Sequence, residues 1–283
     1  MPEPDVIREM SGHFAPTDLR ARVEQALASA GRNSRNTTID GLASFDQLHI
    51  EGLAATRRLA ELAGITQHDI VLDAACGLAG ASRYLAQTFG CTVHGIDLTE
   101  ALLKTAELLN GLTGLSEKVL LRRADVTDMP FRSGSFDVVW TQHAAQSIPD
   151  KPRFFAELHR VLKPGGRGVI HDLYRGPGDP IHFPSFCGTE SIVFLISDRE
   201  MRRLLEAAEF EVTHWADLTA AARAANSAIS LDHAAPSADQ NTIAGLDRSL
   251  LGANRLVEMA ENSVKDFDVG SVGVFEALLR KAG

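Results

Sequence analysis

Apolar side chains near the start of the chain recur at three- and four-residue spacing. This period predicts two amphipathic helices, at 18–30 and at about 52–63. Gly64 follows the second helix, at the position where a glycine commonly ends a helix in the left-handed conformation. The polar stretch 33–38 between the two segments is typical of a loop. The chain therefore begins with helices that precede any sheet.

From residue 70 onward the pattern changes to short apolar runs that alternate with amphipathic segments. The apolar runs predict five strands, at 70–74, 92–97, 119–124, 136–141 and 168–173. The segments between them predict helices at 80–89, from an N-cap at Thr99 to about 112, and from an N-cap at Asp150 over 152–162, and a turn at 163–166. Strand–helix alternation at this spacing is typical of a mostly parallel, doubly wound α/β sheet covered by helices on both faces.

The last third of the chain has a looser pattern. Ser197 and Glu200 have capping-box spacing, which predicts a helix that ends near 208. The remaining periodic segments predict a strand at 211–218, helices at 219–227 and 245–267, and a final strand at 272–279.

Composition narrows the functional class. The chain has 283 residues, of which 45% are hydrophobic and 23% charged, which is typical of one large globular domain or of one domain with a small cap. A formal net charge of −9 disfavours non-specific nucleic-acid binding. There is no apolar run of 18 residues, and the first ten residues lack an apolar stretch, so we expect no membrane span and no secretory signal.

The three cysteines offer neither a disulfide framework nor zinc-ligand spacing. They stand at Cys76, Cys91 and Cys187. Histidine, aspartate and cysteine positions likewise lack metal-ligand spacing, and we expect no metal site. A reducing cytoplasm is the expected location.

The chemistry is expected where the first two strands end. Residues 73–80, Asp-Ala-Ala-Cys-Gly-Leu-Ala-Gly, form a small-residue turn that leads into a helix, so backbone can approach a ligand closely. Asp97 ends the second strand, at the position where a carboxylate can accept hydrogen bonds from both hydroxyls of a ribose.

A nicotinamide dinucleotide fits this turn poorly. That ligand requires Gly-x-Gly-x-x-Gly, whereas glycines stand only at 77 and 80 here. Asp73 precedes the turn, and its carboxylate would repel a pyrophosphate but attract an ammonium group. The turn therefore favours a nucleoside with an amino-acid group, namely S-adenosylmethionine.

Residues 70–173 resemble class I S-adenosylmethionine-dependent methyltransferases. The resemblance rests on five motifs in order, at 71–77, 95–97, 124–131, 135–140 and 158–166. Residues 46–52 and 80–86 resemble the small-molecule branch, which includes sarcosine/dimethylglycine and tocopherol-type methyltransferases. The resemblance implies a seven-stranded sheet whose last strand, near 273–280, is antiparallel.

The same resemblance implies a division of the chain into four parts. These are an N-terminal helical lid at 1–64, a cofactor-binding core at 65–218, a helical insertion between strands six and seven at 219–271, and the last core strand at 272–283. The lid segments are expected to exclude water and to select the acceptor.

The resemblance also assigns the cofactor site residue by residue. Asp73 is placed near the methionine amino group, Asp97 at the ribose and Asp125 at the adenine amino group. The complete implied set is Asp73, Ala75, Gly77, Asp97, Leu98, Asp125, Val126, Thr141 and Gln142. Ala75 stands where relatives commonly have glycine, and a side chain in so tight a turn is expected at negative φ.

Three histidines are candidates for proton transfer: His143, His49 and His171. His143 follows the fourth strand, where the acceptor is expected, and an imidazole there can remove a proton near neutral pH. The alternatives are a hydrogen-bonded wall of the pocket for His143, a surface role for His49 and a core position for His171. Relatives often have a histidine where this chain has Ser147, so no catalytic histidine is implied by the resemblance.

These observations favour methyl transfer to nitrogen, carbon or oxygen of a small molecule, in specialised metabolism. One alternative is a cyclase or isomerase of the same fold that uses the cofactor structurally, and another is a non-catalytic binding module. We expect a small-molecule acceptor and neither nucleic acid nor membrane as partner. The oligomeric state stays open, and the N-terminal helix could pack against a second copy.

Overall fold

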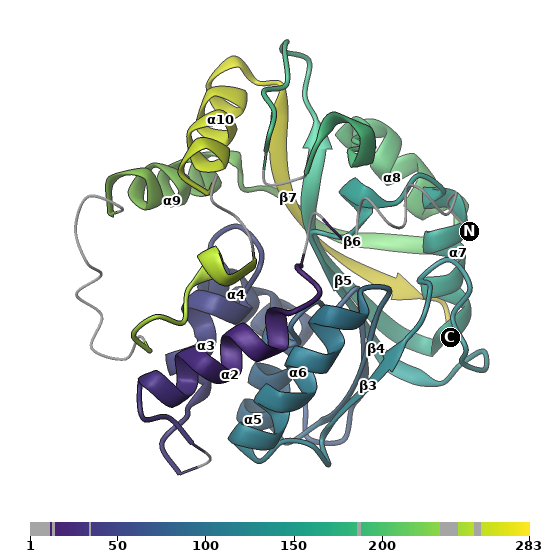
Figure 1. The fold of residues 1–283 in the computed structure, drawn as a ribbon. Coiled ribbons are helices and arrows are strands. Elements are labelled where there is room, and N and C mark those ends of the chain that lie inside the picture. Colours follow the sequence, from purple (N-terminus) through teal and green to yellow (C-terminus); the bar gives the residue numbers. More distant parts are fainter. Residues whose placement is uncertain (1–11, 13–14, 34, 186–187, 233–242, 252–255) are drawn as a thin grey trace.

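The computed structural model describes residues 12, 15–33, 35–185, 188–232, 243–251 and 256–283, so Cys187 lies outside the described residues. Within these residues one sheet of seven strands lies at the centre, in the order β3-β2-β1-β4-β5-β7-β6 (Figure 1). The strands are β1 (Ile70–Ala74), β2 (Thr92–Asp97), β3 (Val119–Arg123), β4 (Phe136–Gln142), β5 (Leu162–Arg175), β6 (Phe210–Asp217) and β7 (Val272–Lys281).

The strand directions confirm the predicted fold class. β1 to β5 pair in parallel, whereas β7 runs antiparallel to both of its neighbours, β5 and β6. The chain moves outward from β1 to β3 and then returns to β4 on the other side of β1. The order therefore reverses between β1 and β4, which is where open sheets of this type bind ligands.

Helices cover both faces of the sheet. Those in the described residues are α2 (Leu19–Ser29), α3 (Ile39–Asp46), α4 (Gly52–Ala63), α5 (Gly80–Phe89), α6 (Glu100–Thr113), α7 (Lys151–Val161), α8 (Asp198–Ala207), α9 (Thr219–Asp232) and α10 (Leu256–Val269). Short 3₁₀ turns are η1 (Ala145–Ser147), η2 (Glu190–Ile192) and η3 (Arg248–Leu251). None of these helices has the length and apolar character needed to cross a membrane.

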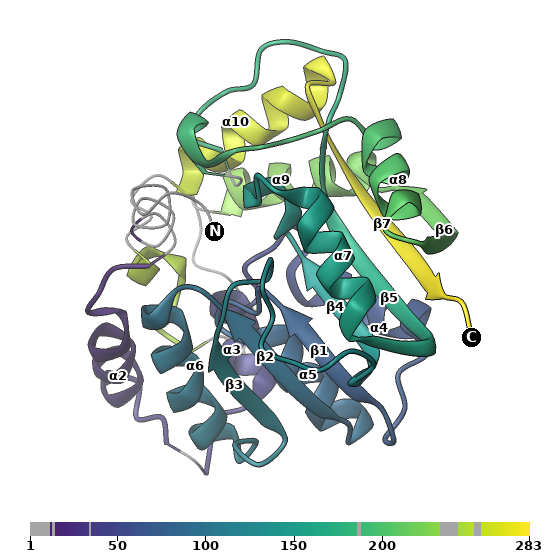
Figure 2. The same cartoon turned by 90° about the vertical axis from the view of Figure 1, so that its right-hand side faces the viewer.

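Two apolar layers hold the helices on the sheet. One contains residues of α4, α5 and α6 packed on the face that presents Trp140, and the other contains residues of α7 and α8 packed on the face that presents Phe275. The N-terminal α2 packs outside α6 in a separate apolar cluster. α9 and α10 lie beyond the edge where β5 ends and β7 begins (Figures 1 and 2).

Local signals set most element ends. The helix predicted at 52–63 is α4, and Gly64 follows it at φ 59°, as predicted. Asp150 caps α7 by accepting a hydrogen bond from Arg153 N, and Ser197 caps α8 by accepting one from Glu200 N. Thr99 occupies the N-cap of α6, but its side chain accepts no bond from the helix.

Two expectations about elements were wrong, and one helix was not predicted. The turn predicted at 163–166 belongs to β5, which begins at Leu162, because Gly165 N donates to Ala282 O, a partner distant in sequence. α3 was not predicted, since its eight residues are too few to show a clear period. The helix predicted at 245–267 does not begin as an α-helix, because its first described part forms η3, and α10 is Leu256–Val269.

Candidate functional site

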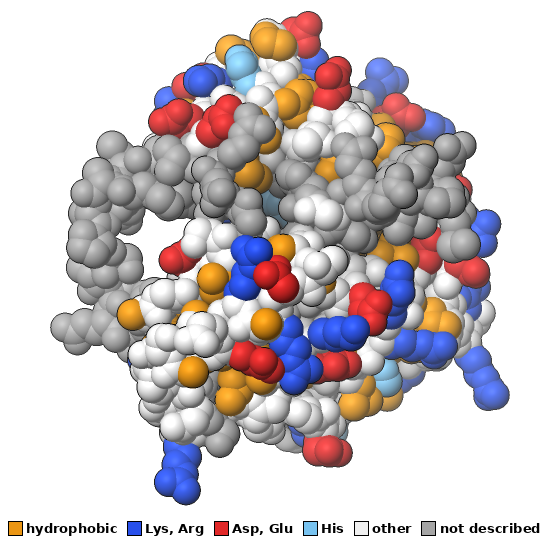
Figure 3. Space-filling view, viewed as in Figure 1, with side chains coloured by type: hydrophobic (Ala, Val, Ile, Leu, Met, Phe, Trp, Pro, Cys, Tyr) orange, Lys and Arg blue, Asp and Glu red, His pale blue; other side chains and the backbone are white. Residues whose placement is uncertain are grey.

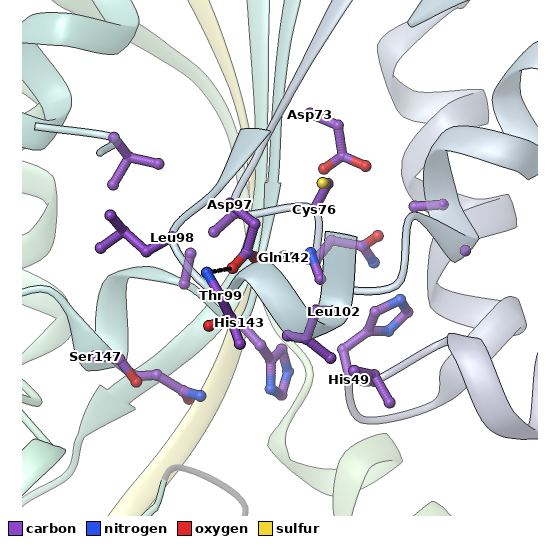
Figure 4. A pocket seen from close by; sticks show the side chains of 18 of the residues that line it. His49, Asp73, Cys76, Asp97, Leu98, Thr99, Leu102, Gln142, His143 and Ser147 are labelled. Carbon is purple, nitrogen blue, oxygen red and sulfur yellow. Dashed lines mark hydrogen bonds between the residues drawn. The ribbon is translucent and has the colours of Figure 1, made fainter. Parts of the chain in front are cut away.

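A cavity opens at the carboxyl ends of β1, β2 and β4, at the reversal of strand order (Figure 4). Its walls come from the segment between α3 and α4, the turn after β1, the start of α6 and the segment after β4. Nine of the predicted site residues line it: His49, Asp73, Ala75, Gly77, Asp97, Leu98, Val126, Gln142 and His143. Asp125, Thr141 and His171 are not part of the lining.

The turn after β1 is held in a strained conformation. Ala75 has φ 64° and Ala79 has φ 57°, so the expectation of negative φ at Ala75 was wrong. Cys76 N donates to Ile96 O at 2.9 Å and Ala79 N donates to Cys76 O at 2.7 Å, and these bonds fix the bend. A left-handed alanine costs about 1–2 kcal/mol, and such strain is typical of functional loops.

Asp97 ties this turn to the start of α6. Its Oδ2 accepts from Gly77 N at 2.9 Å, and its Oδ1 accepts from Thr99 N at 2.8 Å (Figure 4). Burial raises the pKa of Asp97, although these hydrogen bonds act in the opposite direction. Each carboxylate oxygen can accept a second bond, so the group is fixed in place and can still accept hydrogen bonds from a ligand.

Asp73 lies at the end of β1 beside the same cavity. Ser82 Oγ donates to its Oδ2 at 2.5 Å. Burial, with a smaller contribution from the charge of Asp97, raises the pKa of Asp73 to about 7. The carboxyl group is therefore poised to ionise when a positive group enters the cavity.

Of the residues predicted to bind adenine, only one lines the cavity. Val126 lines it. Asp125 Oδ1 accepts from the backbone and hydroxyl of Thr127, both at 2.8 Å, while its Oδ2 is buried without a partner in the described residues. Thr141 is buried in β4, and its hydroxyl also lacks a partner there. The roles assigned to Asp125 and Thr141 stay predictions.

The three candidate histidines form one cluster, although they come from distant parts of the sequence. Their ring centroids are 6.1 Å apart for His49 and His143, 6.0 Å for His49 and His171, and 5.1 Å for His143 and His171. His49 and His143 face the cavity, and His171 is fully buried behind them. Within the described chain, no three His, Cys, Asp or Glu side chains are placed to bind a metal ion.

Burial keeps the two cavity-facing histidines neutral. It lowers the pKa of His49 to about 3 and that of His143 well below its usual value. His143 has φ 51°, and its backbone N donates to His171 O at 2.8 Å. Its Nε2 is buried without a partner among the described residues. A neutral imidazole held in this way can accept a hydrogen bond from a ligand.

A polar network not foreseen from the sequence holds His49. Its Nε2 lies 3.1 Å from Gln47 Oε1, and Thr56 Oγ1 donates to the same oxygen at 2.8 Å. Thr56 Oγ1 also lies 3.3 Å from Gln142 Oε1, which accepts from Trp140 Nε1 at 3.0 Å. The network joins the segment before α4 to the end of β4, so these two parts of the cavity wall are held in fixed positions relative to each other.

Further lining residues were also missed, among them Asp46, Leu102 and Gln146. Asp46 is fully buried and pairs with Arg83 at 2.7 Å, and its second oxygen lies without a partner in the described residues. A Cβ on Gly80 would meet Asp46 O at 2.6 Å, so this glycine is required for the close approach of α3 to α5. The only sequence signal for Asp46 was its place at the start of the 46–52 motif.

Known proteins match the part of the chain that forms this cavity. Residues 72–170 match a family model described as Methyltransferase domain. The match covers 99 of the 283 residues, so this region is similar to a methyltransferase domain. Tocopherol O-methyltransferase of Arabidopsis thaliana is 43% identical over 100 residues, which cover 35% of this chain and 29% of that enzyme. The predicted family resemblance is thus confirmed, over less than a third of that relative's length.

Solved structures are similar to a larger part of the chain than the family model matches. A putative sarcosine dimethylglycine methyltransferase from Galdieria sulphuraria has a TM-score of 0.67 at 20% identity, covering 81% of this chain and 86% of that one. The [4+2]-cyclase SpnF has a TM-score of 0.66 at 20% identity, covering 95% and 97%. At this identity the likeness shows the fold, and the reaction has to be argued from the site.

Proposed function

We propose that this chain transfers a methyl group from S-adenosylmethionine to nitrogen, carbon or oxygen of a small-molecule acceptor. The observation that supports this most is the pair Asp73 and Asp97 at the ends of β1 and β2, either side of the small-residue turn. Asp73 suits an ammonium group, and the fixed carboxylate of Asp97 suits a ribose diol.

The remaining cofactor residues fit the same ligand. Asp125 Oδ2 is a buried acceptor without a partner in the described residues, and an adenine amino group would supply the missing donor. Gly77 has φ 54°, a left-handed conformation that glycine adopts without penalty, and it lines the cavity. When bound, the cofactor supplies an activated methyl group on its sulfonium.

The other wall of the cavity would serve the acceptor. Gln142, His143 and Gln146 present neutral polar groups, and His143 Nε2 and Gln146 Oε1 have no partner in the described residues, so both can accept hydrogen bonds from a ligand. Methyl transfer requires mainly alignment and exclusion of water. An amine acceptor needs only to lose a proton, whereas a hydroxyl or carbon acceptor benefits from a base.

We propose that the segments 1–64 and 219–271 act as the lid, around a core formed by 65–218 and 272–283. α9 and α10 lie at the carboxyl edge of the sheet, the same edge as the cavity (Figure 2). Ile50 shares an apolar cluster with Ala222 of α9 and Phe267 of α10, so the two lid segments meet.

The second candidate is cyclisation or rearrangement with the cofactor as a structural element. The likeness to the [4+2]-cyclase SpnF over 95% of this chain supports it. The two candidates differ in one observable: methyl transfer converts S-adenosylmethionine to S-adenosylhomocysteine, and cyclisation does not.

Calorimetry with S-adenosylmethionine and S-adenosylhomocysteine tests the cofactor. We expect micromolar binding by the native chain and a loss of at least tenfold in Asp97→Ala, with Asp128→Ala, an exposed carboxylate, as the matched control. Acceptors would then be screened for the mass increase of one methyl group. If the native chain binds neither ligand, the proposed function is wrong.

Narrower expectations stay part of the proposal. They are a place in natural-product biosynthesis, a cytoplasmic location, the absence of nucleic-acid and membrane partners, and self-association through the N-terminal helix. The net charge of −9 supports the absence of nucleic-acid partners.

A further inference from the structure

The segment that follows β4 forms one side of the cavity. Four of its polar residues line the cavity: Gln142, His143, Gln146 and Ser147. Gln142 is the last residue of β4, and Gln146 and Ser147 belong to η1. In Figure 4, His143 and Ser147 lie away from Asp73. We call these four residues the acceptor wall.

The backbone of η1 is fixed by groups that do not line the cavity. Asp172 Oδ2 accepts from Ala144 N at 2.9 Å and from Ala145 N at 2.7 Å. Phe194 N donates to Gln146 O at 2.7 Å. These bonds hold the turn without its two polar side chains, which are therefore free to serve a ligand in a fixed position.

The polar atoms of the acceptor wall are buried but not satisfied. Those without a hydrogen-bond partner among the described residues are Gln142 Nε2, His143 Nε2, Gln146 Oε1 and Ser147 Oγ. Gln146 is only 2% exposed and Ser147 only 5%. A buried polar atom without a partner is costly, and native proteins contain few of them. Four such atoms on one side of a cavity indicate a surface that a polar ligand completes.

The kinds of atom in the acceptor wall indicate which ligand group fits. Gln146 Oε1 only accepts hydrogen bonds, and His143 Nε2 accepts them in the tautomer with its proton on Nδ1. Ser147 Oγ both accepts and donates, and Gln142 Nε2 donates. A hydroxyl group also donates one hydrogen bond and accepts others, so it matches this mixture of atoms.

Apolar side chains complete the same part of the cavity. Leu48, Ala144 and Ile148 line it together with the acceptor wall. Small-molecule sites commonly combine apolar surface with a few polar groups that orient the ligand. The ligand expected here therefore has an apolar body in addition to its hydroxyl groups.

An anionic acceptor does not suit this cavity. Its lining contains the carboxylates of Asp46, Asp73 and Asp97, and none of the described lining residues is Lys or Arg. Asp46 already pairs with Arg83 at 2.7 Å. A phosphate or carboxylate group would thus lose its water and meet other carboxylates without a cation in the lining.

A cationic acceptor does not suit the acceptor wall either. Burial lowers the pKa of His49 to about 3 and that of His143 well below its ordinary value, and the charge of Arg248 acts in the same direction. Arg248 is not among the lining residues, and it donates to Gln47 O. Surroundings that disfavour an imidazolium ion also disfavour an ammonium group.

We propose that the acceptor is an uncharged molecule with an apolar body and at least one hydroxyl group, which binds to His143, Gln146 and Ser147. This substrate class rests on the proposed function, because the acceptor wall serves methyl transfer only when the cofactor occupies the side of Asp73 and Asp97. The three residues are binding residues that orient the acceptor toward the cofactor.

Ligand-observed nuclear magnetic resonance tests the substrate class on the full chain saturated with S-adenosylhomocysteine. Four probes share an aromatic ring and differ in charge: benzyl alcohol, benzoate, phenyl phosphate and benzylamine. We expect benzyl alcohol to bind more tightly than each charged probe by about fivefold or more. Equal or tighter binding of any charged probe overturns the proposal, and so does the absence of binding by benzyl alcohol.

The acceptor wall itself is tested by Gln146→Met and Ser147→Ala. We expect each to weaken the binding of benzyl alcohol by about threefold or more, because each removes a hydrogen-bond acceptor. Gln25→Met, the same change at an exposed position of α2, is the matched control and should leave the affinity unchanged. Wild-type affinity in both Gln146→Met and Ser147→Ala overturns the proposal.

Urea unfolding of the chain without ligand provides a measurement that is independent of the probes. Gln146→Met should raise the midpoint concentration of urea, because it removes a buried oxygen that has no partner in the described residues. Thr56→Val should lower the midpoint, because Thr56 Oγ1 donates to Gln47 Oε1 at 2.8 Å. If Gln146→Met lowers the midpoint as much as Thr56→Val does, then Gln146 serves the fold and the proposal is wrong.

Calorimetry separates this result from the proposed function. Gln146→Met and Ser147→Ala should bind S-adenosylhomocysteine within about twofold of wild type, since neither residue is assigned to the cofactor. If the wild-type chain binds no S-adenosylhomocysteine, the proposed function itself fails. If it binds S-adenosylhomocysteine and prefers a charged probe, only the substrate class is wrong.

Discussion

At the scale of single residues, strain is concentrated around the cavity. Five non-glycine residues in the described chain have positive φ, and four of them, Glu51, Ala75, Ala79 and His143, belong to segments that form its walls. The fifth, Glu209, precedes β6. The native state therefore tolerates unfavourable backbone where it positions the turn after β1 and the histidine cluster.

Relief of this strain should be measurable at Ala75. We expect Ala75→Gly to raise the free energy of unfolding by about 0.5–1 kcal/mol, because glycine adopts φ 64° without penalty. Ala224→Gly, at an exposed position within α9, should instead lower it by about 1 kcal/mol. Urea unfolding measures both changes, and the comparison requires an unchanged m-value. Equal destabilisation by the two substitutions would contradict the prediction that Ala75 is strained.

Asp73 should make stability depend on pH. Its pKa is raised to about 7 in the folded chain from an ordinary value of 3.8, so the stabilisation is fully present below about pH 4 and is lost as the pH rises through 7. Asp73→Asn lacks this loss. We expect the unfolding free energy of the variant relative to wild type to increase by about 2–3 kcal/mol between pH 5 and pH 8, by urea denaturation.

The same substitution should weaken cofactor binding, because the amide cannot balance an ammonium group. Wild-type affinity for S-adenosylhomocysteine is expected to rise between pH 6 and pH 8, while that of Asp73→Asn stays flat, by calorimetry. A difference in stability that is the same at pH 5 and pH 8 would show that Asp73 is already ionised throughout this range.

At the scale of elements, one buried ion pair joins α3 to α5. Arg83 donates to Asp46 at 2.7 Å and also to Asn110 Oδ1 and Leu78 O, and both charged side chains are fully buried. Removing one partner leaves the other charge uncompensated. We expect Asp46→Ala to cost about 3–5 kcal/mol of unfolding free energy, measured in urea.

The exposed ion pair of Arg20 and Glu24 provides the control for Asp46→Ala. Glu24→Ala should alter the unfolding free energy by less than about 1 kcal/mol, because solvent screens the pair. If Asp46→Ala is as mild as Glu24→Ala, then the cavity wall formed by α3 does not depend on the buried pair.

The approach of α3 to α5 also depends on Gly80. An added Cβ would lie 2.6 Å from Asp46 O, so Gly80→Ala must displace the segment that leads to His49. We expect at least a tenfold loss of S-adenosylhomocysteine affinity. Gly111→Ala, within α6 with no atom near its added Cβ, should bind normally and gain about 0.5–1 kcal/mol. Equal affinity of the two variants would contradict the argument.

Prediction from the sequence was most accurate where local signals determine both the bounds of an element and the position of a site residue. The bounds of β1, α5 and β2 were predicted without error, because apolar runs and glycines mark their ends. Asp73 and Asp97 followed from the strand ends, since parallel strands bring their carboxyl ends together. The left-handed Ala75 was not predicted, because its φ is imposed by the bond of the adjacent Cys76 N to Ile96 O.

Contacts between distant segments were not available to sequence reasoning. The histidines were each suggested singly, and only the sheet brings His49, His143 and His171 within about 6 Å of one another. Glu51 stands within the 46–52 motif, but nothing in the sequence linked it to His171, which lies 120 residues further along the chain. Periodicity reports which face of an element is buried and gives no information about which buried groups meet.

At the scale of the whole molecule, charge of both signs is spread over the surface. Figure 3 shows Lys and Arg side chains interspersed with Asp and Glu on one face. The formal net charge of −9 is nevertheless negative, and the cavity adds the carboxylates of Asp46, Asp73 and Asp97. A ligand with a positive charge should therefore be attracted to the cavity, and one without net charge should not.

S-adenosylmethionine and S-adenosylhomocysteine test this electrostatic attraction, because they differ mainly in the methyl group and the positive sulfonium charge. We expect the affinity for S-adenosylmethionine to fall several-fold between about 20 mM and 500 mM salt, as screening shortens the Debye length from about 20 Å to about 4 Å. The affinity for S-adenosylhomocysteine, which has no net charge, should change by less than about twofold over the same range. Calorimetry at both salt concentrations measures the two responses side by side. Equal salt dependence of the two ligands would mean that the cavity carboxylates are neutralised before binding, through protonation of Asp73 and the pairing of Asp46 with Arg83.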